Sequence, residues 1–173
     1  MVSAALAVLG ADVYGAHKSA GLQNGLRLAG LSQMTEAELR DVVISKHLTV
    51  YWLGPESGAS YLLNAMDPLA ISLTIVTSSS LVKETRASYP QIGTYVQKNA
   101  FQAVLTGGGT KDIAGFINAD GNSVYYSSVD SKNVFVGFRG LDIEVQIFDP
   151  IVGESLAFAK APGRLVPITR SPR

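Results

Sequence analysis

The feature that most constrains the fold is the recurrence of apolar residues at every second position in the stretch NVFVGFRGLDIEVQIFD, residues 133–149. Apolar side chains occupy every second position on both sides of an Arg-Gly turn, at Val134, Val136, Phe138, Ile143, Val145 and Ile147. Successive side chains of a strand point to opposite faces of a sheet, so this period predicts an antiparallel hairpin. Asp142, Glu144 and Gln146 fill the intervening positions, which predicts that the second face of the hairpin is wet.

Shorter runs rich in β-branched and aromatic residues predict further strands. They cover residues 48–53, 60–65, 70–77, 92–96, 113–117, 123–128 and 163–168. Residues that favour turns separate several of these runs, namely Gly54-Pro55, Asp67-Pro68 and Asp120-Gly121. The Asp-Gly pair is a strong signal for a two-residue hairpin turn, because glycine adopts positive φ without steric cost.

Three short helices are predicted among the strands, over residues 32–46, 99–105 and 152–161. In the first, Thr35 stands three residues before Glu38, the spacing at which both side chains cap the helix start. In the second, Phe101, Val104 and Leu105 are expected to share the buried side. The resulting fold class is α+β, a largely antiparallel sheet with about three short helices packed mainly on one face.

Size and charge exclude several classes of protein. A chain of 173 residues fits one domain with an N-terminal appendage. Fourteen basic residues balance fourteen acidic ones, so no overall positive field attracts nucleic acid. The chain contains no cysteine, which excludes disulfides, thiolate metal sites and a cysteine nucleophile.

The N-terminal run VSAALAVL, residues 2–9, permits two interpretations. It is too short to span a bilayer, which takes about 20 residues, so it is either a small helix packed on the domain or the end of a membrane anchor. Residues 20–30 are rich in glycine and alanine and have the character of a linker. We therefore divide the chain into residues 1–30, an anchor remnant and linker, and residues 31–173, a single α+β domain.

No motif indicates a cofactor or a metal. The GGGTK stretch at residues 107–111 follows a helix and lacks the spacing of a phosphate-binding loop. The NADGNS stretch at residues 118–123 begins like a calcium loop, but the twelfth position holds Val129 instead of glutamate. His17 and His47 are the only imidazoles and fall on separate elements, which argues against a zinc site.

Two sets of residues are candidates for function. Asp142 and Glu144, working with His47, are the groups that a hydrolase would use, since general acid–base chemistry needs carboxylates and imidazole in one cleft. Tyr51 and Trp52, the latter the only tryptophan, are candidates for a ligand-binding surface together with His47. Because neighbours on a strand point to opposite faces, we expect one of the two aromatic residues in the core under the first helix, which leaves the other able to face solvent. Core packing is the favoured interpretation for Trp52, and a binding role is the alternative.

The order of several motifs resembles that of a group of uncharacterised actinobacterial extracytoplasmic proteins. VYWLGP is followed by SYLL, IGTYVQKNAFQAV, VFVGFRGLDIEVQIFDP and GRLVPI. In the group, a VYW-x-GP strand precedes a TYP stretch, an alanine-rich helix and an EVYDP-like strand. The resemblance spans residues 39–168, and the segment 69–88 departs from it. It implies a location outside the cytoplasm and an N-terminal membrane segment, and implies no activity or cofactor.

The sequence thus leads to a non-enzymatic extracytoplasmic accessory or binding domain, membrane-associated through its N-terminus. Its partner would be an unidentified ligand or an envelope protein. The alternatives are a hydrolase built on Asp142, Glu144 and His47, and a structural domain for protein–protein interaction. A polar pocket joining the three residues would favour the hydrolase, and an exposed apolar patch would favour assembly with a partner.

Overall fold

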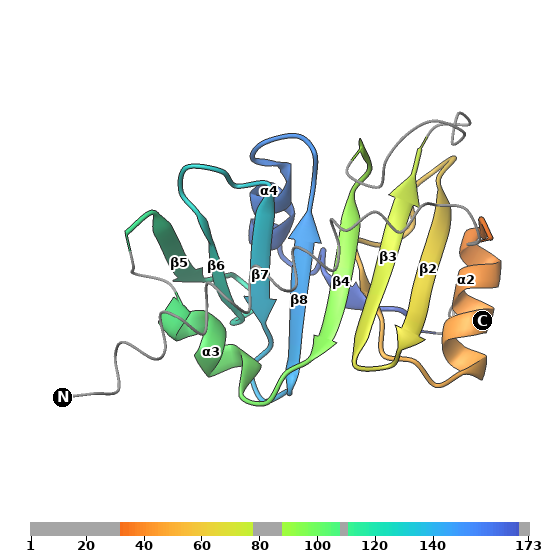
Figure 1. Ribbon diagram of the computed structural model, residues 1–173, viewed down its shortest axis with the longest axis horizontal. Helices are drawn as coiled ribbons and strands as arrows, with labels where there is room; N and C mark the ends of the chain where they lie inside the picture. The colour runs from red at the N-terminus through yellow and green to blue at the C-terminus, as the bar shows by residue number, and fades with distance from the viewer. Residues whose placement is uncertain (1–31, 78–87, 108–110, 170–173) are drawn as a thin grey trace.

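A computed structural model describes residues 32–77, 88–107 and 111–169 of the chain. Seven antiparallel strands form one large sheet in the order β2-β3-β4-β8-β7-β6-β5, and β1 and β9 form a second, two-stranded sheet (Figure 1). The elements are α2 (Glu36–Ser45), β1 (Tyr51–Trp52), β2 (Ser60–Asp67), β3 (Ala70–Val76), β4 (Gln91–Val96), α3 (Ala100–Gly107), β5 (Ile113–Ile117), β6 (Ser123–Ser127), β7 (Asn133–Gly137), β8 (Ile143–Phe148), α4 (Glu154–Lys160) and β9 (Val166–Pro167). The α+β class is confirmed.

The first helix begins at the predicted capping box. The Thr35 hydroxyl accepts a hydrogen bond from the Glu38 backbone N–H at 3.3 Å, and the Glu38 carboxylate accepts one from the Thr35 N–H at 2.8 Å. Each side chain satisfies a backbone donor that the start of a helix leaves free. Leu39 and Val43, four residues apart, are then buried in the core.

The large sheet has a core face and a polar face. Alternation along β8 places Val145 and Ile147 on the core face, together with Leu73 and Ile92 of the neighbouring strands. Helices α2 and α4 and the small sheet pack on this side, which Figure 1 shows with α4 and β9 behind the large sheet. Helix α3 packs on the other side, where Ala100 approaches Gly137 of β7.

The prediction that one side of the 133–149 hairpin is wet is wrong. Glu144 is 3% exposed, and Gln146 and Phe135 on the same face are also buried. The strand order brings large side chains beside this face: the ring of Tyr125 on β6 stacks 4.6 Å from Phe135, and Tyr95 on β4 lies opposite Glu144. The buried Gln146 side chain is satisfied on the polar face: it donates to Asn133 Oδ1 at 2.8 Å and accepts from the Tyr95 hydroxyl at 3.2 Å.

Helix α3 turns a different side to the sheet than its sequence predicted. The buried residues are Ala100 and Val104, whereas Leu105 is 39% exposed. Phe101 is half-buried beneath the guanidinium of Arg139, 4.4 Å from its ring. Glycine is needed at position 137, because a Cβ there would lie 2.5 Å from the backbone oxygen of Ala100.

The 113–127 hairpin forms where it was predicted, but its turn is longer than the expected two residues: the N–H of Asn118 donates to the oxygen of Asn122, so three residues, 119–121, lie between this closing pair. Strands β5 and β6 pair from Ile117 and Ser123 outward, and Gly121 has φ +79° in the turn. Asn118 Oδ1 accepts hydrogen bonds from the N–H groups of Asp120 and Asn122 at 3.1 and 3.0 Å. By contrast, the strand predicted at residues 48–53 shrinks to two paired residues, because β1 pairs only with the short β9.

Candidate functional site

Trp52 belongs to the core. Its side chain is 2% exposed, its ring lies 6.0 Å from the ring of Tyr61, and the guanidinium of Arg40 lies 4.6 Å above it. Tyr51 is buried as well: its N–H donates to Thr94 Oγ1 at 3.0 Å, and its ring lies 4.4 Å from Phe138. The burial of Trp52 agrees with the favoured interpretation, and Tyr51 does not face solvent either, because β1 is covered on both sides by α2 and the large sheet.

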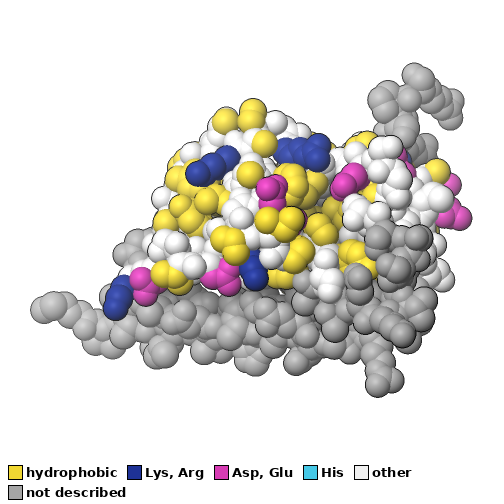
Figure 2. Space-filling view, turned by 90° about the horizontal axis from the view of Figure 1, so that it is seen from above, with side chains coloured by type: hydrophobic (Ala, Val, Ile, Leu, Met, Phe, Trp, Pro, Cys, Tyr) yellow, Lys and Arg dark blue, Asp and Glu magenta, His cyan; other side chains and the backbone are white. Residues whose placement is uncertain are grey.

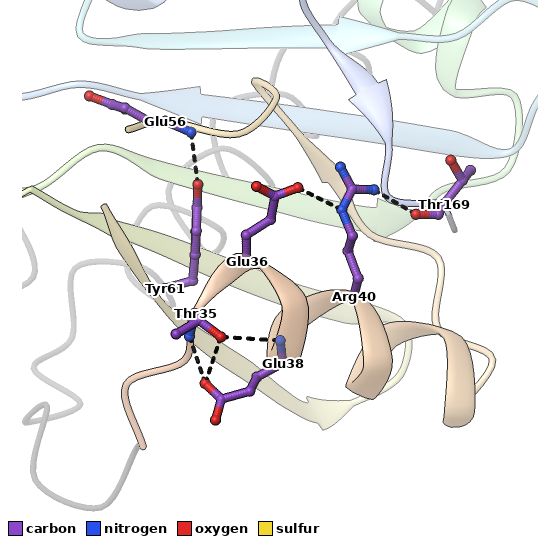
Figure 3. A network of polar contacts seen from close by, with 7 residues as sticks. All are labelled: Thr35, Glu36, Glu38, Arg40, Glu56, Tyr61 and Thr169. Atoms are coloured by element: carbon purple, nitrogen blue, oxygen red, sulfur yellow. Dashed lines mark hydrogen bonds and ion pairs between the residues drawn. The ribbon is translucent and has the colours of Figure 1, made fainter. Parts of the chain in front are cut away.

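A polar network around α2 closes over this buried strand (Figure 3). Arg40 forms an ion pair with Glu36 at 2.8 Å and donates from Nη1 to the backbone oxygen of Thr169 at 2.6 Å. The Tyr61 hydroxyl accepts from the Glu56 N–H at 3.0 Å, just after the Gly-Pro stop. The network joins α2 to the chain beyond β9, and its geometry is that of a structural clamp.

His47 is exposed at the C-terminal end of α2. Its φ is +52°, and its backbone N–H donates to the oxygen of Ile44 at 3.2 Å, which closes the last helical turn. Four residues later Tyr51 bonds to Thr94 on the core face of β4. His47 therefore belongs to the layer of the molecule on the core side of the sheet.

The two carboxylates of the hydrolase alternative lie apart from His47. Asp142 sits in the turn between β7 and β8, where its Oδ1 accepts from the Asn99 N–H at 2.9 Å immediately before α3. Glu144 is buried on the polar face, opposite Tyr95 in the register of β4 and β8. The sheet separates Glu144 from the layer that holds His47, so the arrangement gives no shared cleft for the three groups.

Asp149 is a buried carboxylate that the sequence did not single out as a site. It is 5% exposed at the end of β8, and its Oδ1 accepts from the Ile151 N–H at 2.8 Å. Burial raises its pKa above the ordinary value, and the negative charges of Glu154 and Glu56 raise it further. Glu56 lies far from Asp149 in the sequence, so no local pattern indicated their interaction.

Large aliphatic side chains are exposed at both ends of the sheet. Met66, 87% exposed, Leu69, Val96 and Leu141 lie at the lower end in Figure 1; we name these four the aliphatic row. At the upper end, Val129, Ile151 and Val152 are exposed on two neighbouring loops. Figure 2 looks onto the upper end and shows hydrophobic side chains there among basic and acidic ones.

The backbone segments that carry the aliphatic row lie next to one another across neighbouring strands. Met66 and Leu69 flank the turn between β2 and β3, and the N–H of Val96 donates to the oxygen of Leu69 at 3.0 Å. The next N–H, of Gln97, donates to the oxygen of Asp142, the neighbour of Leu141, at 2.9 Å. Adjacent strands are about 4.8 Å apart, so the row runs roughly 10–15 Å along the sheet end.

Within the described residues, no group of three histidine, aspartate or glutamate side chains is arranged to hold a metal ion. The helices of the same part of the chain are all too short or too polar to cross a membrane. The apolar run at residues 2–9, on which the anchor prediction depends, lies outside the described residues.

No family model, curated protein or solved structure matches the chain. The residues themselves therefore carry the functional argument.

Proposed function

We propose that this chain is a non-enzymatic binding domain outside the cytoplasm, and that its ligand is a protein of the cell envelope. The observation that carries the proposal is the aliphatic row of Met66, Leu69, Val96 and Leu141. Single exposed apolar residues are normal on a protein surface. Four exposed aliphatic residues on adjacent turns and strand ends are the kind of group that binds a partner.

The energetics fit a transient complex. Fully burying an aliphatic side chain contributes about 1.5–3 kcal/mol, and the four residues of the row are 48–87% exposed in the free chain. Association costs about 4–15 kcal/mol in lost freedom. The row can therefore anchor an interface but needs polar contacts around it, for which the exposed Lys98 and Asp67 beside the row are suited.

The positions of the polar candidates favour binding over catalysis. Asp142 is engaged in holding the backbone before α3, and Glu144 lies on the face of the sheet turned away from His47. A general acid–base pair must reach the same substrate atoms within hydrogen-bond distance. The hydrolase alternative draws no support from this arrangement.

Site-specific photocrosslinking tests the proposal. A photoreactive amino acid is placed at Met66 or Leu141 in the row, and at Val129 or Ile151 at the opposite end as a matched control of equal character. All four side chains are exposed, so substitution should change stability by less than about 0.5 kcal/mol. We expect a discrete protein adduct in cells from the row positions alone. Equal adducts from both ends, or adducts with lipid only, would contradict a protein partner at the row.

The proposed location follows from the motif resemblance and has its own test. Full-length chain is fused at its C-terminus to alkaline phosphatase, which gains activity only where its disulfides form. We expect an active fusion in a bacterial host, and the same fusion lacking residues 1–30 should be inactive. Activity that does not depend on residues 1–30 would remove the anchor from the proposal and leave the binding row unaffected.

A further inference from the structure

The two outer strands of the large sheet, β2 and β5, differ in how far their free edges are covered. At the β2 edge, Met34 pairs with Tyr61 through two backbone hydrogen bonds of 2.9 Å, and the chain then enters α2. A register shift between Asn64 and Asp67 further distorts this edge. Covering segments and irregularities of this kind prevent a strand from pairing with another chain.

Among the described residues, no strand pairs with the outer side of β5, and the strand itself is regular. The strand reads Ile-Ala-Gly-Phe-Ile and contains no charge, no proline and no register shift against β6. Gly115 is exposed and Ile117 is 44% exposed, so the edge is accessible near its middle and its end. An open, apolar edge of regular geometry is a template for adding a strand.

The backbone groups that point outward can be assigned from the hydrogen bonds at the two ends of the hairpin. The N–H of Asn118 donates to Asn122 and the oxygen of Asp112 accepts from Ser128, both across to the β6 side. In an antiparallel pair, every second residue directs its N–H and C=O groups to the partner strand. The even-numbered residues from Asp112 to Asn118 therefore bond to β6, and the odd-numbered residues direct these groups away from it. Those residues are Ile113, Gly115 and Ile117, and no described strand pairs with their outer side.

The geometry points to a second copy of this chain as the occupant of the β5 edge. A two-fold axis midway between the Gly115 residues of two copies, perpendicular to the sheet, would place their β5 strands antiparallel. Gly115 of one copy would then lie opposite Gly115 of the other. Ile113 of each copy would then face Ile117 of the other, and Ala114 would face Phe116. In this register all three outward residues of both copies donate and accept a hydrogen bond.

The sequence of β5 suits this self-pairing. The strand is nearly symmetric about its central glycine, with isoleucine at both ends, so a single two-fold register aligns bulky residues with each other. A glycine inside a strand often marks a close approach by another backbone. The two isoleucine pairs would add apolar cross-strand contacts on one face of the joined sheet.

Sedimentation velocity of the purified full-length chain tests the inference, over concentrations from about 1 µM to about 200 µM. We expect a reversible monomer–dimer equilibrium. Ile117→Lys places a charge on the edge and should raise the dimer dissociation constant roughly tenfold or more. A wild-type chain that stays monomeric overturns the inference, and so does a dimer that Ile117→Lys leaves unchanged.

Two single-cysteine variants test the register, since the chain itself has no cysteine. In the proposed dimer the two Gly115 Cα atoms are about 5.5 Å apart, within disulfide reach. The two copies of Ala119 are roughly 27 Å apart. Gly115→Cys should therefore form a covalent dimer on mild oxidation, whereas Ala119→Cys, exposed on the same hairpin, should form no covalent dimer. Equal crosslinking of both variants would refute the register.

Discussion

The guanidinium of Arg40 lies over the ring of Trp52 at the boundary of the core, 4.6 Å from the ring centroid. The same guanidinium pairs with Glu36 and donates to the backbone oxygen of Thr169. One side chain thus covers the only tryptophan and joins α2 to the chain that follows β9. The motif VYWLGP therefore serves the packing of the fold, and its aromatic residues are positions where substitution should cost stability.

Trp52→Ala should lower the free energy of unfolding by about 3–5 kcal/mol, because it leaves a cavity beneath Arg40 and beside Tyr61. Chemical denaturation followed by circular dichroism measures the loss, and Trp52→Phe should lose less. In the wild-type chain the fluorescence of this single tryptophan should be blue-shifted and resist quenching by iodide. A red-shifted, readily quenched emission would contradict its burial.

Arg40→Met should cost about 1–3 kcal/mol, since methionine keeps much of the apolar stem but removes the contact with Trp52 and the bond to Thr169. Glu36→Gln is the matched control, because the ion pair alone contributes at most about 1 kcal/mol near the surface. Equal losses in the two variants would show that the ion pair, and not the aromatic and backbone contacts, carries the effect.

Local patterns in the sequence predicted the elements well. The capping box of Thr35 and Glu38 and the Asp120-Gly121 turn depend on residues close together in the chain, and both form where the sequence predicts them. Alternation in the 133–149 stretch located β7 and β8 for the same reason. Such signals describe a strand or a helix end without reference to what packs against it.

What the sequence could not show depends on the order of strands in the sheet. Glu144 had the pattern of a solvated strand face, but β8 pairs with β4 and becomes an interior strand. The aliphatic row has no period along the chain, and only the sheet order brings Met66, Val96 and Leu141 to one end. Likewise, Glu56 is distant from Asp149 in the sequence, and only the fold brings its charge close enough to raise the pKa of Asp149.

Thr35→Ala should destabilise the protein by about 1 kcal/mol, because it removes an acceptor for the free N–H groups at the start of α2. The contribution of Glu38 should depend on pH. The backbone N–H of Thr35, and then its hydroxyl, lower the pKa of Glu38 below 4.5. A lowered folded-state pKa stabilises above pH 4.5, and this stabilisation is lost as the pH falls through the folded-state value.

The comparison with Glu38→Gln isolates this effect. The difference in unfolding free energy between wild type and Glu38→Gln should be constant at neutral pH and shrink below about pH 4.5. Urea denaturation over a series of pH values measures it. A difference that grows on acidification would contradict the capping role of the carboxylate.

The effect of Asp149→Asn on stability should depend on pH with the opposite sign to that of Glu38→Gln. Burial and the charges of Glu154 and Glu56 raise the pKa of Asp149 above 3.8, so its ionisation destabilises the fold as the pH rises through the interval above 3.8. Asparagine cannot ionise, and it retains an oxygen to accept from the Ile151 N–H. The stability of Asp149→Asn relative to wild type should therefore increase with pH from about 4 upward. A pH-independent difference would show that Asp149 ionises without penalty.

Gly137→Ala tests how tightly α3 is seated on the sheet. A Cβ at this position would lie 2.5 Å from the backbone oxygen of Ala100 and 2.8 Å from the Cα of Phe101. These are main-chain atoms, so relief requires moving the whole helix. We expect a loss of about 1–3 kcal/mol and faster amide hydrogen exchange in α3 than in α2. Gly121→Ala is the control: its Cβ meets nothing within 4 Å, and its φ of +79° adds backbone strain alone. That variant should leave exchange in α3 unchanged. If Gly137→Ala instead left both stability and exchange at wild-type values, the close approach of α3 to β7 would not exist in solution.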